Sequence, residues 1–222
     1  MYKNILNKNR FILLSTLMLI LTSIMGCFMI FLRKYIIGDA WYSFLIWNLF
    51  LSWIPYFLSL FLYIMFKIKV FKFRNILFAG IGIIWIIFYP NLPYMVTDFI
   101  HIKNFDSVLM WYDFIVFSLF IYTSFFMGFV SIYIVFKIIL KYYNIRIAVC
   151  FTTFMLLITS YGIYLGRFIR WNSWDIIFRP KALFESILSS INLNAIIFSL
   201  VFSLFLILVY GFLYFLTHLS EE

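Results

Sequence analysis

The residues best suited to chemistry stand in two short segments of a largely apolar chain. Asp98 and His101 are spaced i, i+3, so a helix would place them on one face, with Tyr94 one turn earlier. An Asp–His pair can hold an imidazole in one tautomer for acid–base catalysis, or bind a metal ion. Arg167 and Arg170 repeat this spacing, and guanidinium groups bind phosphate or carboxylate in a bidentate manner. The two segments together predict a site for an anionic substrate.

Two further acids complete the candidate set. Asp113 begins a later apolar segment at the same expected depth as Asp98, and Asp175 lies just beyond the arginine pair. Charges near hydrocarbon are costly, so by default such a cluster marks a functional site. The expected catalytic residues are Asp98, His101, Asp113 and Asp175. The expected substrate-binding residues are Arg167, Arg170, Tyr94, Asn91 and Trp174.

Each candidate also has a structural interpretation. The arginine pair could reach lipid phosphates and simply end a helix. The three aspartates could be ion-pair partners that lock loops, and His101 could bond a backbone carbonyl at the membrane interface. Trp174 also fits an aromatic belt. These alternatives stay open at the level of sequence.

Metal and nucleotide chemistry find little support in the sequence. There is one nearby histidine, no useful cysteine and no HExxH or paired-histidine spacing, so we expect no metal site. P-loop, GxGxxG and serine-elbow motifs are also missing from the sequence, so nucleotide use is not supported. The residues identify no cofactor.

The composition indicates which elements must position these side chains. The chain is 66% hydrophobic and 11% charged, with a mean hydropathy of +1.08, more apolar surface than a soluble domain of 222 residues could bury. The net charge of +9 would suggest nucleic acid in a soluble protein. Here it fits basic cytoplasmic loops and anionic headgroups, so we expect membrane lipids as partners and no nucleic acid.

The predicted fold class is all-α, a polytopic membrane helix bundle of about six transmembrane helices forming a single integral membrane domain over residues 1–222. The expected spans are residues 11–32, 41–66, 76–100, 111–136, 147–166 and 195–216. A short loop is expected at 33–40, and basic loops at 67–74 and 137–146. The termini share a side with the excess of Lys and Arg, which predicts that both are cytoplasmic and that the candidate site is extracytoplasmic.

Proline and glycine predict where the third and fifth spans meet other elements. Pro90-Asn91-Leu92-Pro93 interrupts the third span after residues 76–89, which cover only about 21 Å of a hydrocarbon core of about 30 Å. Irregular backbone at that depth is tolerated only against protein or a watery cavity. Gly162-x-x-x-Gly166 in the fifth span permits close helix approach. Pro180 is expected to open a short amphipathic helix, and Asn48 and Pro55 are interpreted as packing and kink residues.

Four runs of sequence carry a resemblance to a known family. They are WNLFLSWIPY (Trp47 to Tyr56), FYPNLPYMVTDFIHI (Phe88 to Ile102), WYDF (Trp111 to Phe114) and GIYLGRFIRWNSWDIIFRP (Gly162 to Pro180). In this combination the chain, from about the second span onward, resembles bacterial multi-pass membrane proteins of domain of unknown function 1361. The resemblance implies a protein of the bacterial cytoplasmic membrane. It implies no activity, and no catalytic residue is carried over from it.

Three functions remain for such a chain. The first is an enzyme acting on a lipid-linked or anionic substrate at the extracytoplasmic face through the Asp/His/Arg cluster. The second is a non-catalytic scaffold or assembly subunit whose charged loops dock a protein partner. The third is a transporter or lipid-handling protein, which would be expected to place several ionisable residues deep in its spans, where the sequence has essentially none.

Overall fold

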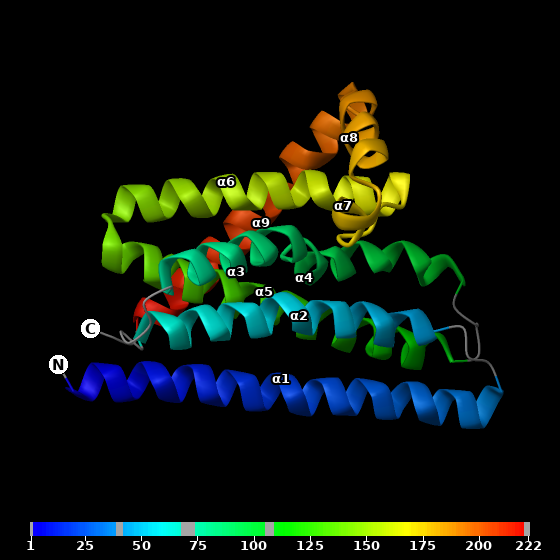
Figure 1. The fold of residues 1–222 in the computed structure, drawn as a ribbon. Helices are drawn as coiled ribbons and strands as arrows, with labels where there is room; N and C mark the ends of the chain where they lie inside the picture. Colours follow the sequence, from blue (N-terminus) through cyan, green and yellow to red (C-terminus); the bar gives the residue numbers. More distant parts are fainter. Residues whose placement is uncertain (1, 39–41, 68–73, 105–108, 220–222) are drawn as a thin grey trace.

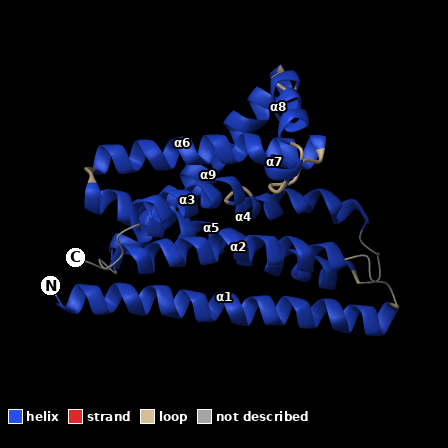
Figure 2. Cartoon of the chain, viewed as in Figure 1, coloured by secondary structure: helices blue, strands red, loops and turns tan. Residues whose placement is uncertain are grey.

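The computed structural model describes residues 2–38, 42–67, 74–104 and 109–219, and every regular element among them is helical (Figure 2). The elements in chain order are α1 (Tyr2–Ile37), α2 (Ser43–Lys67), α3 (Arg74–Phe88), α4 (Asn91–Tyr94), the 3₁₀ helix η1 (Met95–Asn104), α5 (Met110–Tyr142), α6 (Ile145–Tyr164), the π-helical turn η2 (Leu165–Ile169), α7 (Asp175–Phe178), α8 (Pro180–Ser189) and α9 (Leu193–Leu219). The predicted all-α class is confirmed.

Six helical segments of the described residues are long and apolar enough to cross a membrane. They are Arg10–Ile36, Ser43–Lys67, Asn75–His101, Met110–Tyr142, Ile145–Ile169 and Leu193–Thr217. Several basic residues expected in loops lie in helices instead. Arg33 and Lys34 belong to the last turns of α1, and Lys137 and Lys141 to the end of α5, because the helices continue past the apolar runs.

The centre of the bundle is α5, which packs against α1, α2, η1, α6 and α9 (Figure 1). Its span is 72% buried, whereas the spans of α1 and α9 are only 11% and 17% buried and turn most of their apolar side chains outward. Phe117, Phe120 and Met127 of α5 and Trp85 of α3 are fully buried in this core. An outer helix with an exposed apolar surface is stable in lipid, where that surface needs no protein cover.

The third span breaks where its prolines predicted. α3 ends at Phe88, and α4 and η1 carry the chain onward. The break is backed by protein, since Ser124 of α5 donates to the Leu92 carbonyl at 2.6 Å and lies 2.6 Å from the hydroxyl of Ser52 in α2. Tyr89 donates to the Gly128 carbonyl at 3.2 Å. The bond to Leu92 satisfies a backbone group of the interrupted segment that would otherwise face hydrocarbon, and the Tyr89 bond ties that segment to α5.

The two glycines of the fifth span let the broken third span approach closely. A Cβ on Gly162 would lie 3.2 Å from Pro90 Cγ, and a Cβ on Gly166 would lie 3.2 Å from Tyr94 Cε2. Both contacts are tighter than ordinary van der Waals packing, so a larger side chain would push the two segments apart. The small residues therefore position the irregular segment that carries Asn91, Tyr94 and Asp98.

The ends of the bundle differ in character. α1 begins and α9 ends at the same end, as an even number of crossings requires (Figure 1). The short helices α7 and α8 lie against the C-terminal end of α6, away from the termini (Figure 1). Pro180 stands in the first turn of α8, the favoured position for proline in a helix.

Candidate functional site

The three predicted aspartates fall into three separate groups. Each group is centred on one ion pair of the described residues: Asp98 with Arg167, Asp113 with Arg33, and Asp175 with Arg179. The expectation that all these charges share one pocket is therefore wrong. The cost of burying a charge favours a nearby partner for each carboxylate, and each of the three finds one.

The first group joins the third and fifth spans. Arg167 Nη2 forms an ion pair with Asp98 Oδ1, and its Nε donates to Thr97 Oγ1 at 2.7 Å. Its Nη1 lies 3.5 Å from His101 Nε2, and the guanidinium sits 4.3 Å from the ring centroid of Tyr94. Three of the predicted residues, Tyr94, Asp98 and His101, thus gather around the guanidinium of a fourth, Arg167. We call Tyr94, Thr97, Asp98, His101 and Arg167 the Arg167 cluster.

Asn48 completes the bonding of Asp98 and was missed by sequence reasoning, which assigned it to packing. Its Nδ2 donates to Asp98 Oδ2 at 3.1 Å, while Arg167 occupies the other carboxylate oxygen. Asp98 itself is fully buried. A carboxylate held on both oxygens is suited to positioning its partners, and the clue to Asn48 was a strong polar group deep in an apolar span.

Irregular helix geometry decides which side chains meet. In the 3₁₀ helix η1, residues three apart eclipse one another, so Asp98 and His101 point the same way as predicted. The arginine pair was expected on one α-helical face, and this is wrong. Arg167 lies in the π-helical turn η2, and Arg170 follows it in the left-handed conformation with φ of 68°, so Arg170 is exposed and lies away from the ion pair.

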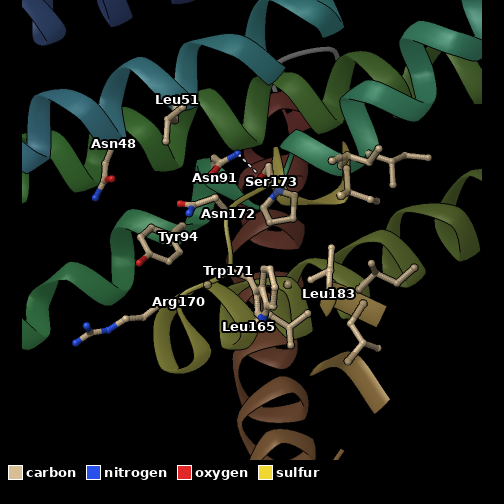
Figure 3. A pocket seen from close by; sticks show the side chains of 18 of the residues that line it. Asn48, Leu51, Asn91, Tyr94, Leu165, Arg170, Trp171, Asn172, Ser173 and Leu183 are labelled. Carbon is tan, nitrogen blue, oxygen red and sulfur yellow. Dashed lines mark hydrogen bonds between the residues drawn. The ribbon is translucent and has the colours of Figure 1, made fainter. Parts of the chain in front are cut away.

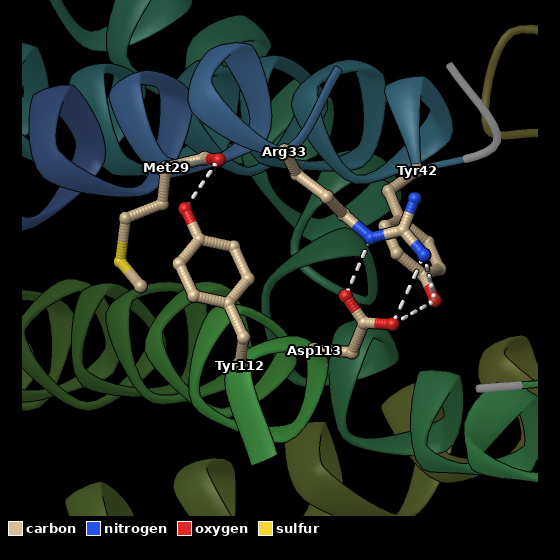
Figure 4. A network of polar contacts seen from close by, with 5 residues as sticks. All are labelled: Met29, Arg33, Tyr42, Tyr112 and Asp113. Carbon is tan, nitrogen blue, oxygen red and sulfur yellow. Dashed lines mark hydrogen bonds and ion pairs between the residues drawn. The ribbon is translucent and has the colours of Figure 1, made fainter. Parts of the chain in front are cut away.

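The second group fastens α1 to α5 (Figure 4). Arg33 Nη2 donates to Asp113 Oδ2 at 3.0 Å, Nε is bonded to Oδ1, and Tyr42 donates to Oδ2 at 2.8 Å. Nearby, Tyr112 donates to the Met29 carbonyl at 2.7 Å. Asp113 and Arg33 are almost wholly buried, so this group is a structural clamp. A lone acid opening a span needed a counter-charge, and Arg33 at the end of the first span was available to supply it.

The third group shapes the loop after the fifth span. Asp175 accepts from the Asn172 backbone N–H at 2.8 Å and from Arg179 Nη2 at 2.7 Å. The Arg179 guanidinium also lies 5.0 Å from the Trp171 ring centroid. Burial raises the pKa of Asp175, but these donors outweigh it and hold that pKa below its usual value. Asp175 therefore organises the turn into α7.

A crevice of about 500 Å³ opens beside the Arg167 cluster (Figure 3). Its walls come from α2, α3, α4, α6, α7, α8 and the loop at 170–173. The polar lining residues are Asn48, Asn91, Tyr94, Arg170, Asn172 and Ser173, with the indoles of Trp47 and Trp171. The apolar ones include Leu51, Ile86, Ile87, Ile158, Leu183 and Ile187. Asn48 and Tyr94 belong to both the lining and the surroundings of Arg167, so they connect the crevice to the ion pair.

The predicted residues relate to this crevice in different ways. Asn91, Tyr94 and Arg170 line it, whereas Asp98, His101 and Arg167 lie behind Asn48 and Tyr94. Asp113, Asp175 and Trp174 do not line it, although the Trp174 ring centroid is 6.4 Å from that of the lining Trp47. Within the described part of the chain, no three His, Cys, Asp or Glu side chains group as metal ligands.

Comparison with known proteins places the chain in a family. No curated protein and no solved structure matches it. A family model described as "Protein of unknown function (DUF1361)" matches residues 47–209, which covers most of the second and sixth spans, everything between them, the Arg167 cluster and the crevice. The chain is therefore a multi-pass membrane protein that belongs to the DUF1361 family of proteins of unknown function.

Proposed function

We propose that this protein binds the headgroup of an anionic, lipid-linked molecule in the crevice and acts on it at the membrane interface. The observation that carries the proposal is the composition of the crevice wall. The wall combines apolar side chains such as Ile86, Ile158 and Ile187 with the Arg170 cation and three asparagines. An amphiphile likewise combines an apolar chain with a polar headgroup.

Size and setting support a lipid-linked ligand. A volume of about 500 Å³ falls within the ~300–1,000 Å³ typical of small-molecule sites. The wall includes residues of three membrane spans, α2, α3 and α6, so the crevice reaches into the membrane-spanning part of the protein. Trp47 is 54% exposed beside the polar end, which suits an indole at the boundary between hydrocarbon and headgroups.

The Arg167 cluster supplies the candidate chemistry. His101 lies next to the guanidinium that Asp98 orients, and histidine is the side chain most often used for general acid–base catalysis. A headgroup entering past Tyr94 would meet this cluster. In this proposal His101 is the general acid or base, Arg167 stabilises developing negative charge, and Asp98 is a positioning residue.

The proposal also assigns a side of the membrane. Basic residues are more numerous on the side of the termini, which supports cytoplasmic termini and an extracytoplasmic crevice in a bacterial cytoplasmic membrane. Single cysteines introduced at the exposed positions 146 and 170 would be labelled from outside with a membrane-impermeant maleimide. Labelling of position 170 and protection of 146 is expected. The opposite pattern would overturn the assignment.

Lipid retention tests the binding step. We expect native mass spectrometry of the purified wild type to show a bound anionic lipid, and Arg170→Asn to lose it. Asparagine tolerates the left-handed backbone at this position, so the change removes the charge with little strain. Arg146→Asn, at an exposed position outside the crevice, is the matched control. Equal retention by Arg170→Asn and wild type would refute the proposal.

A second assay tests the chemical step. Cells lacking the protein would be complemented with wild type, His101→Ala or Arg167→Lys, and their lipids profiled. A substrate that accumulates in the deletion strain should also accumulate with His101→Ala, while Arg170-dependent lipid retention persists. Full complementation by His101→Ala would exclude the catalytic role and leave lipid binding alone.

A further inference from the structure

We propose that the headgroup held in the crevice is rich in hydroxyl groups, as in a sugar or glycerol headgroup, and carries a single anionic group. This inference rests on the proposed lipid binding and names the chemistry of the ligand. It is drawn from the hydrogen bonds of three asparagines that line the polar part of the crevice, Asn48, Asn91 and Asn172. Their amide groups are oriented by the protein before any ligand arrives.

The amide nitrogen of Asn91 is fully used within the protein. It donates to the Phe88 carbonyl at 2.9 Å and to Ser173 Oγ at 3.0 Å, and Figure 3 shows the second of these bonds. A carbonyl oxygen can only accept, so the amide must turn its nitrogen towards Phe88. The side-chain oxygen of Asn91 is then the atom left to meet a ligand.

Asn48 and Asn172 are fixed in the same way by carboxylates. Asn48 Nδ2 donates to Asp98 at 3.1 Å, and Asn172 Nδ2 lies 3.4 Å from Asp175 Oδ2. A carboxylate engaged by arginine is ionised and accepts only. Within the described residues no donor bonds the side-chain oxygens of these two asparagines or of Asn91.

The crevice therefore presents three amide oxygens that need donors. An ionised phosphate or carboxylate offers acceptors alone, so a headgroup made only of such groups would leave these oxygens unsatisfied. Hydroxyl groups donate and accept, and they match both these oxygens and the hydroxyls of Ser173 and Tyr94. Among the described residues that line the crevice, Arg170 is the one cation. A headgroup with one anionic group would match its charge.

The aromatic side chains of the crevice fit the same ligand. Trp47 and Trp171 both line it, and flat apolar rings pack well against the C–H face of a sugar ring. Trp171 is held by the Arg179 guanidinium 5.0 Å from its ring centroid, so its position is set in advance. A rigid ring against a pre-oriented amide wall selects for shape as well as for hydrogen bonding.

A lipid competition measures this preference. Purified wild type would be mixed with equal amounts of phosphatidic acid, phosphatidylglycerol and a glucosyl diacylglycerol of identical acyl chains, and bound lipid quantified by native mass spectrometry. Phosphatidylglycerol, which carries hydroxyl groups and one anionic phosphate, should exceed phosphatidic acid by about tenfold, as expected when hydrogen bonds to several acceptors are lost. A glucosyl lipid signal equal to or above that of phosphatidylglycerol would overturn the single anionic group, because the glucosyl headgroup is uncharged.

Variants separate this inference from the proposed function. Asn172→Ala removes one amide oxygen and keeps the backbone N–H that donates to Asp175. It should therefore reduce the preference for hydroxyl-bearing lipids over phosphatidic acid severalfold. Asn75→Ala, at an exposed position at the start of α3, should leave it unchanged. If phosphatidic acid binds as well as the hydroxyl-bearing lipids and still depends on Arg170, the headgroup inference fails and lipid binding stands. If no lipid binds, both fail.

Discussion

Arg167 in the π-helical turn of the fifth span and Asp98 in the 3₁₀ end of the third span form a buried ion pair across 69 residues of sequence. Neither segment is a regular α-helix, and each places its charge where a straight helix would not. The pair fixes the position of Tyr94 and Asn48, which also line the crevice. Both the free energy of unfolding and lipid binding should therefore depend on this contact, and the two effects can be measured separately.

Removing one partner of the pair should destabilise the protein strongly. Arg167→Met leaves Asp98 buried without its cation, which costs about 3 kcal/mol in the free energy of unfolding. The double variant Arg167→Met/Asp98→Leu should recover part of that loss, because no buried charge remains. Thermal unfolding of the purified variants in one detergent gives the comparison. Strictly additive losses would show that the two side chains are not coupled.

The clamp between α1 and α5 should affect stability without affecting lipid retention. Asp113→Ala leaves Arg33 buried without its carboxylate and should cost about 3 kcal/mol, while Tyr42→Phe removes one hydrogen bond and should cost about 1 kcal/mol. Both are read from thermal unfolding. Neither residue lines the crevice, so lipid retention by folded Tyr42→Phe should equal that of wild type. A folded Tyr42→Phe variant that no longer retains lipid would count against a purely structural role of the clamp.

Alanine at Gly162 should disturb the contact with the broken third span. Its Cβ would press on Pro90, and we expect a loss of about 1 kcal/mol or more together with weaker lipid retention. Gly82→Ala in α3 is the control, since a Cβ there meets nothing within 4 Å. Alanine in an open helical position should be neutral or stabilise by ~0.5–1 kcal/mol. Equal melting temperatures for the two variants would contradict the close packing.

The loop held by Asp175 should lose stability in acid. The pKa of Asp175 is lower in the folded protein than in the unfolded chain, so its contribution is complete above the unfolded value of about 3.9 and is lost as the pH falls through the folded value. The difference in unfolding temperature between wild type and Asp175→Asn should be constant at neutral pH and shrink below about pH 4. A difference in unfolding temperature that grows in acid would contradict a lowered pKa of Asp175 in the folded protein.

The large features of this fold could be predicted because they depend on local sequence. Uninterrupted apolar runs specify spans, and two prolines three residues apart interrupt a regular α-helix, so the six spans and the break near 90–93 follow directly. Gly162 and Gly166 likewise predicted that the fifth span lies close to another element. What they could not reveal was the partner, because packing against Pro90 and Tyr94 is a tertiary relationship.

The sorting of charges into three pairs was beyond the sequence for a physical reason. Helical spacing assumes regular geometry, and the π-helical turn with a left-handed Arg170 breaks the i, i+3 relationship between the two arginines. Arg33 was assigned to a loop because apolar sequence ends before it, yet the helix continues and buries it against Asp113. The sequence could bring Asp98 and Arg167 together, because both lie in segments that were predicted to contain a site.

An experimental structure of the protein in native lipid tests the central claim most directly. Density for a headgroup should occupy the crevice between Asn91, Asn172 and Arg170, with acyl chains running along Ile86 and Ile187. A crevice filled by the protein's own side chains, or occupied by acyl chains with every headgroup outside it, would contradict the account.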